Sequence, residues 1–75
     1  MTRIFDAKGM KCPLPVLKAR KLLRDLAPGD ILEIHATDPG APKDFVHFCD
    51  TTGHKLVDST EADGVFVIKV ECAAG

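Results

Sequence analysis

The sequence predicts an α+β fold, a two-layer sandwich in which a mixed four-stranded sheet carries two helices on one face. Its 75 residues, 45% of them hydrophobic, supply one core, so we expect a single domain over residues 1–75. Glycine and proline divide the chain into six pieces. Their hydrophobic patterns give the order strand, helix, strand, helix, strand, strand, which favours that sandwich.

The first half of the chain supplies the first three elements. Residues 3–7 form a short piece with Ile4 and Phe5, which suits a strand. Residues 13–27 are predicted to be a helix that ends at Pro28-Gly29, because hydrophobic residues recur there at helical spacing: Val16, Ala19, Leu22, Leu23 and Leu26. Residues 31–37 alternate between apolar and polar side chains, which is typical of a half-buried strand.

The second half supplies the other three. Residues 41–52 are predicted to form a helix with Phe45, Phe48 and Cys49 on its apolar stripe, ending at Gly53. Residues 56–60 form a weaker strand and residues 65–72 a strong one, joined at Asp63-Gly64 in a hairpin. Glu33, His35, Lys69 and Glu71 should then face solvent on the open side of the sheet.

Composition excludes several classes of protein. The net charge of -1 favours neither nucleic acid nor an anionic membrane as a partner. Neither a signal peptide nor a run of eighteen apolar residues occurs, so we expect a cytoplasmic protein without membrane insertion. The odd number of cysteines argues against a disulfide framework, and the Cys and His spacings match no compact metal pattern. We therefore expect no metal.

The segment Cys12-Pro13-Leu14-Pro15 carries the chemistry. Proline is favoured in the first turn of a helix, so the segment predicts a rigid helix start with Pro13 as first helical residue and Cys12 at the N-cap. The helix dipole, the free N–H groups of the first turn and the nearby Lys8 and Lys11 would favour a thiolate or a persulfide anion there. The alternative is that Cys12 merely occupies a cap position, where Ser, Thr, Asp or Asn serves better.

Several short motifs together resemble the TusA/SirA family of sulfur-carrier proteins. The likeness begins with Asp6, Gly9 and the Cys12-Pro13-Leu14-Pro15 motif. It continues over nearly the whole chain through Pro28-Gly29-Asp30, Asp38-Pro39, Phe48-Cys49, Gly53-His54 and Asp63-Gly64.

The resemblance implies a βαβαββ sandwich that acts as a sulfurtransferase. Cys12 would accept sulfur as a persulfide from a cysteine desulfurase or rhodanese-type donor and pass it to an acceptor protein; Gly9, Pro13, Leu14 and Pro15 belong to the motif that carries it. No cofactor is expected besides the transient persulfide on Cys12. The pathways that the resemblance implies are tRNA 2-thiolation, molybdenum-cofactor supply and sulfur oxidation, among which the sequence does not choose.

Helical spacing places Leu14 and Leu17 outside the apolar stripe, among basic residues. We expect a docking patch for protein partners with acidic surfaces, made of Lys11, Leu17, Lys18, Lys21 and Arg24. The alternatives are that a sheet edge hides one leucine and that the charges are a solvated face. Without an aromatic platform, direct nucleic-acid binding is not expected. The protein is expected to be a monomer.

The other cysteines and histidines receive no catalytic assignment. Cys49 is predicted to be a buried hydrophobe, and Cys72 to be buried if the last strand reaches it or exposed if that strand frays. His54 would cap carbonyls or lie near Cys12, and His35 and His47 are expected at the surface. Two other functions compete with the carrier: an interaction module in which Cys12 is dispensable, and a thiol-redox protein that forms a Cys12–Cys72 disulfide.

Overall fold

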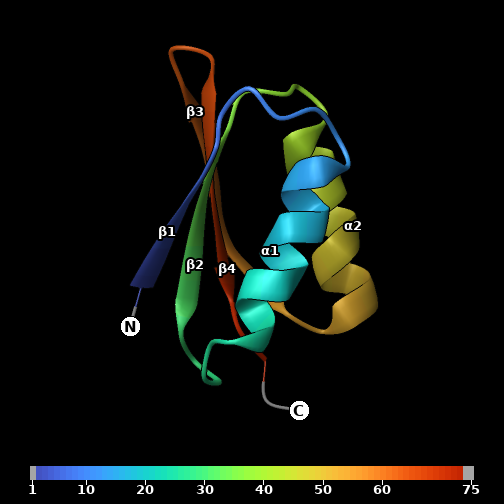
Figure 1. The fold of residues 1–75 in the computed structure, drawn as a ribbon, viewed down its shortest axis with the longest axis vertical. Coiled ribbons are helices and arrows are strands. Elements are labelled where there is room, and N and C mark those ends of the chain that lie inside the picture. The colour runs from blue at the N-terminus through green and yellow to red at the C-terminus, as the bar shows by residue number, and fades with distance from the viewer. Residues whose placement is uncertain (1, 74–75) are drawn as a thin grey trace.

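The computed structural model describes residues 2–73, which form four strands and two helices (Figure 1). In chain order they are β1 (Thr2–Ala7), α1 (Leu14–Arg24), β2 (Ile31–Ala36), α2 (Ala41–Thr52), β3 (Lys55–Ala62) and β4 (Val65–Glu71). The βαβαββ order predicted from the sequence is confirmed.

The four strands form one mixed sheet in the order β1-β2-β4-β3. β1 and β2 are parallel, with α1 as their crossover connection, whereas β4 pairs antiparallel with both β2 and β3. Both helices lie on one face of this sheet, as predicted, and leave the other face open (Figure 1).

The core lies between the sheet and the two helices. Leu32, Ile34 and Ala36 point into it from β2, because alternate residues of a strand face the same side. Opposite them in register, Ile68 and Val70 of β4 are fully buried. The helices contribute Ala19, Leu23, Ala41, Phe45, Phe48 and Cys49. The predicted apolar faces of β2, α2 and β4 are therefore confirmed.

Two predicted elements differ from the observed ones by more than one residue at an end. The helix expected over residues 13–27 begins at Leu14 and ends at Arg24, with Pro13 as N-cap and Asp25 as C-cap. Leu26 misled the prediction, since it packs against the core from beyond the helix end. The weak strand expected over 56–60 is β3, Lys55–Ala62, and its residues are mostly exposed. Its pairing with β4, interrupted between Leu56 and Asp58, sets its length.

The hairpin turn between β3 and β4 lies at Asp63-Gly64, as predicted. Both residues have positive φ, 53° for Asp63 and 80° for Gly64. This left-handed conformation suits a two-residue hairpin turn and is best tolerated by glycine and aspartate or asparagine. The two residues therefore fix the register in which β3 meets β4.

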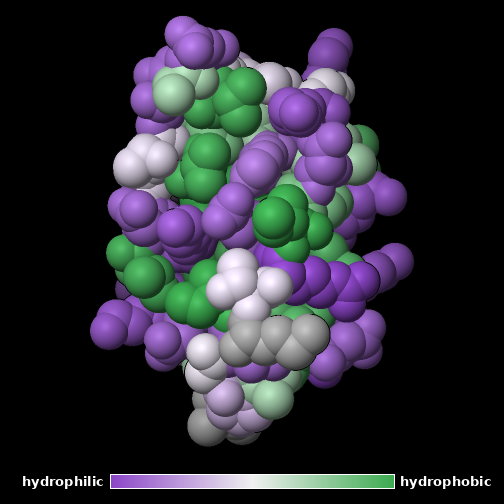
Figure 2. Space-filling view, turned by 90° about the vertical axis from the view of Figure 1, so that its left-hand side faces the viewer, coloured by the Kyte–Doolittle hydropathy of each residue, from purple (hydrophilic) through white to green (hydrophobic). Residues whose placement is uncertain are grey.

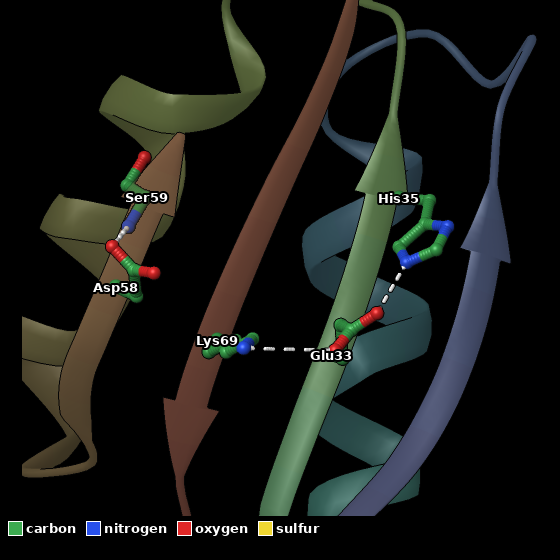
Figure 3. A network of polar contacts seen from close by, with 5 residues as sticks. All are labelled: Glu33, His35, Asp58, Ser59 and Lys69. Atoms are coloured by element: carbon green, nitrogen blue, oxygen red, sulfur yellow. Dashed lines mark hydrogen bonds and ion pairs between the residues drawn. The ribbon is translucent and has the colours of Figure 1, made fainter. Parts of the chain in front are cut away.

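The open face of the sheet is a mosaic in which apolar patches alternate with polar side chains (Figure 2). Glu33 lies at its centre, 2.6 Å from His35 Nε2 and 4.0 Å from Lys69 Nζ (Figure 3). Glu33, His35, Lys69 and Glu71 lie on this face as predicted, although each is only partly exposed. Within residues 2–73, no helix has the length and apolarity needed to cross a membrane.

The parallel pairing of β1 and β2 determines where the loops lie. Ala7 is paired with Ala36, so the loops that follow the two strands leave the sheet at the same end and lead into the N-termini of α1 and α2 (Figure 1). The start of β1 and the end of β4 lie at the opposite end, where Thr2 and Glu71 are both paired with Ile31.

Candidate functional site

Cys12 lies in the loop between β1 and α1, with its side chain partly exposed. Two short turns shape this loop. The Met10 N–H donates to the Ala7 carbonyl at 3.1 Å, and the Leu14 N–H donates to the Lys11 carbonyl at 2.9 Å. The second turn encloses Cys12 and Pro13, so the thiol is presented on a constrained segment immediately before α1.

The predicted N-cap position of Cys12 is wrong. Pro13 is the N-cap, and Cys12 lies one residue further from the helix. The Leu14 N–H is taken by the Lys11 carbonyl, and Pro15 has no N–H to donate. The start of α1 therefore offers the sulfur fewer hydrogen-bond donors than an ordinary helix start.

The start of α2 contributes to the site, which the sequence prediction missed. Gly40 is the N-cap of α2, and a Cβ added to it would lie 3.9 Å from Cys12 Sγ. The sulfur is therefore close to the N-terminus of a second helix, where the helix dipole favours negative charge. Since both helices begin at one end of the sheet, the fold places Cys12 beside both N-termini.

Asp38 is the second residue that the prediction missed at this site. Its Oδ2 accepts a hydrogen bond from the Cys12 N–H at 2.9 Å, and its Oδ1 accepts one from the Gly40 N–H at 2.8 Å. Aspartate commonly bonds the backbone two residues on, so Asp38-Pro39-Gly40 carried a signal for the contact with Gly40. The contact with Cys12 spans 26 residues, and no local pattern predicts it.

The residues of the predicted docking patch share one exposed surface around α1. Leu14 and Leu17 are 47% and 50% exposed, so the alternative that the sheet hides one of them is wrong. The predicted cations are exposed as well: Lys11, Lys18, Lys21 and Arg24. Two of these cations, Lys18 and Lys21, also line a groove of about 400 Å³ between α1 and β1, together with Arg3 and Ile4.

The other two cysteines are buried. Cys49 packs in the core, where desolvation raises the pKa of its thiol. The Cys72 thiol donates to the Leu23 carbonyl at 3.5 Å, near the C-terminal end of α1. Since Cys12 precedes the N-terminus of the same helix, the length of α1 separates the two thiols. A Cys12–Cys72 disulfide would need the fold to open.

The three histidines lie in separate parts of the fold, and His47 lines a hollow with Pro13 of the cysteine loop. His54 Nδ1 accepts a hydrogen bond from the Ala73 N–H at 3.0 Å, and its ring stacks on Phe48 with centroids 5.7 Å apart. His54 therefore fixes the chain after β4 instead of lying near Cys12. His47 is exposed on α2, and His35 pairs with Glu33. Over residues 2–73, no group of three His, Cys, Asp or Glu side chains is arranged to hold a metal ion.

Fold and site together define a small two-layer α/β domain that presents one thiol beside the starts of its two helices. The chain belongs to the sulfurtransferase TusA family, whose model matches residues 3–72. This confirms the resemblance found in the sequence and supports a role in sulfur transfer.

Named relatives agree with this assignment. A Neisseria meningitidis protein, named only as a candidate sulfur carrier protein, is 53% identical over 67 residues, which cover 89% of this chain and 90% of the relative. The sulfur carrier protein TusA of Allochromatium vinosum is 48% identical over 62 residues, 83% of this chain and 82% of that one. The solved structure of a SirA-like protein from Desulfitobacterium hafniense shares the fold, with a TM-score of 0.84 over 99% of this chain and 100% of that one, at 24% identity.

Proposed function

We propose that this chain is a persulfide carrier in which Cys12 takes sulfur from a donor protein and delivers it to an acceptor protein. The observation that carries the proposal is the position of Cys12, a partly exposed thiol in the Cys12-Pro13-Leu14-Pro15 motif beside the start of α2. The other two thiols among residues 2–73 are buried and thus poorly placed to meet a partner.

The chemistry needs a thiol that is first a nucleophile and then a carrier. The Cys12 thiolate attacks the terminal sulfur of a donor persulfide, so a new S–S bond forms on Cys12 while the donor's S–S bond breaks and the donor cysteine leaves as a thiolate. An acceptor thiolate then attacks the terminal sulfur on Cys12 and releases the Cys12 thiolate. Sulfur and electrons balance in each step, and no external oxidant or reductant is required.

Partners supply the remaining catalytic groups in this proposal. Asp38 is an acidic side chain close to Cys12, but its two oxygens accept backbone N–H bonds, so it is engaged as an acceptor. The proposed donor is a cysteine desulfurase or a rhodanese-type protein. The proposed acceptor serves tRNA 2-thiolation, molybdenum-cofactor supply or sulfur oxidation.

The exposed surface of α1 is the proposed docking patch for these partners. Leu14 and Leu17 would lose exposed apolar area in a complex, which is favourable. Lys11, Lys18, Lys21 and Arg24 would guide an acidic partner surface toward Cys12. Exposed leucines beside a basic rim also suit an interaction module that does not need its cysteine, which is the second candidate function.

Intact-protein mass spectrometry tests the proposal. The chain is incubated with a cysteine desulfurase and cysteine, or with a rhodanese and thiosulfate, and its mass is compared with that of C12S. We expect a gain of one sulfur atom that a reductant removes and that C12S lacks. A C12S chain that still supports its pathway, or a wild-type chain that neither donor loads, would favour the interaction module.

A further inference from the structure

The loop that carries Cys12 is held by two adjacent side chains that follow β2, at the same end of the sheet. The Gly9 N–H donates to Thr37 Oγ1 at 2.9 Å, and the Cys12 N–H donates to Asp38 Oδ2 at 2.9 Å. Thr37 and Asp38 directly follow β2, whose pairing with β1 fixes their position. The cysteine loop is thereby fastened at both its beginning and its end.

Asp38 makes a second connection from the same carboxylate. Its Oδ1 accepts the Gly40 N–H at 2.8 Å, so one side chain joins the backbone of the cysteine to the N-cap residue of α2. A Cβ on Gly40 would lie 3.3 Å from Asp38 Oδ1 and 3.9 Å from Cys12 Sγ. The carboxylate and the sulfur therefore flank the same point at the N-terminus of α2.

A carboxylate at this position carries an electrostatic cost for a carrier of anionic sulfur. Like charges disfavour one another, so Asp38 opposes a thiolate or persulfide anion on Cys12. A carboxylate has an advantage that asparagine lacks, because both of its oxygens accept hydrogen bonds, whereas a carboxamide has only one acceptor oxygen. The two backbone bonds explain why an acidic residue is useful here despite its charge.

We propose that Thr37 and Asp38 form a clamp on the cysteine loop, in which Asp38 is a positioning residue for persulfide transfer. The clamp holds the Cys12 backbone so that its sulfur keeps one direction relative to both helix starts. Attack on a sulfur–sulfur bond is fast only when the three sulfur atoms are aligned, and a fixed loop avoids the loss of orientation on each encounter. This inference rests on the proposed function for its role in transfer.

D38N tests the clamp, with D58N as the matched control. Asp58 is an exposed residue of β3 that bonds only the N–H of its neighbour Ser59 among the contacts drawn in Figure 3. We expect amide exchange at Cys12 or Gly40 to become about tenfold faster in D38N, the factor expected for losing a hydrogen bond to a charged group. The transfer rate at saturating donor should fall, while the donor concentration that gives half-saturation stays unchanged.

The pH profile of Cys12 alkylation separates positioning from a general loss of structure. Removing the negative charge of Asp38 favours the thiolate, so alkylation of D38N should reach its plateau at a lower pH than in the wild type. Charged residues close in sequence to Cys12 and Gly40 stay unchanged in the variant: Asp6, Lys8, Lys11, Lys43 and Asp44. A thiol that is more reactive toward a small reagent but slower in protein-to-protein transfer is the expected signature.

Thr37 supplies a second, independent pair of variants. T37S keeps the hydroxyl acceptor for the Gly9 N–H and should transfer sulfur as the wild type does, whereas T37V removes that acceptor and should be slower. If amide exchange at Cys12 and Gly40 and the maximal transfer rate in D38N, T37V and D58N all equal those of the wild type, the clamp is wrong. If the wild type itself cannot be loaded, the proposed function fails, and amide exchange and the alkylation profile alone decide the clamp.

Discussion

The three cysteines of this chain have different surroundings, and the difference should be visible in their reactivity. Cys12 is partly exposed, while Cys49 and Cys72 are buried among core residues. Desolvation raises the pKa of the Cys49 thiol, so it stays protonated at neutral pH and is a poor nucleophile. The Cys72 thiol is directed at the Leu23 carbonyl.

We therefore predict that a thiol reagent modifies one cysteine of the native chain rapidly at neutral pH. Mass spectrometry after brief alkylation should find the label on Cys12, and C12S should lose this fast phase entirely. In denaturant, all three thiols should react. Rapid labelling of Cys49 or Cys72 in native C12S would contradict the burial described above.

At the residue scale, the sequence singled out Cys12, whose thiol is partly exposed beside the start of α2, but it predicted only part of the surroundings of that thiol. Cys12, Pro13 and Pro15 are adjacent in the chain, so their local pattern indicated a constrained thiol at a helix start. Asp38 and Gly40 reach the site through the parallel pairing of β1 with β2. A single sequence contains no local signal for such a contact, since it depends on strand register.

At the scale of the elements, α1 combines two roles. Ala19 and Leu23 bury one side of the helix in the core, while Leu14 and Leu17 remain exposed on another. The helix was predicted from this same spacing, although its C-terminal bound was placed too late because Leu26 continues the apolar pattern. Hydrophobic spacing identifies which residues pack against the core, but not where the backbone stops being helical.

The exposed leucines of α1 should matter for docking and not for folding. We predict that L17E weakens loading by the donor about tenfold or more through a higher half-saturation concentration, since burying one leucine contributes about 1.5–3 kcal/mol. V46E is the matched control, because Val46 is 52% exposed on α2. Steady-state loading measured over a range of donor concentrations provides the test.

Both variants should unfold at the same denaturant concentration as the wild type, because neither side chain is in the core. Equal loading by L17E, V46E and wild type would show that partners dock elsewhere. Equal defects in the two variants would indicate that both helices contact the donor.

At the scale of the whole molecule, a small core leaves little reserve of stability. A chain of 75 residues is expected to have about 4–11 kcal/mol of folding free energy. Phe45 is fully buried, and its ring lies 6.2 Å from that of Phe48 in an edge-to-face arrangement. It is one of the largest fully buried side chains among the described residues.

We predict that F45A lowers the free energy of unfolding by about 3–5 kcal/mol, which is much of the total for a domain of this size. Chemical denaturation followed by circular dichroism measures the change. F45L, which keeps most of the volume, should lose clearly less. A loss of under about 1 kcal/mol in F45A would mean that the core tolerates the cavity.

The fold as a whole was more predictable than its details. Burial on one side of the sheet produces the alternation of apolar and polar residues in β2 and β4, and it also produces the spacing of apolar residues in both helices. β3 was the weakest prediction for the same reason, since its mostly exposed residues carry no alternating pattern. The strand order β1-β2-β4-β3 required the structure, because hydrophobicity does not say which strands are neighbours.

The separation between the cysteine loop and the opposite end of the sheet has a practical consequence for biophysical work. β1 starts and β4 finishes far from the loop that holds Cys12 (Figure 1). A chain tethered to a sensor surface through the start of β1 or the end of β4 would present its thiol toward the flowing solution. Fluorescent labels attached there would likewise report on partner encounters without obstructing the sulfur, so binding and loading can be recorded on one immobilised sample.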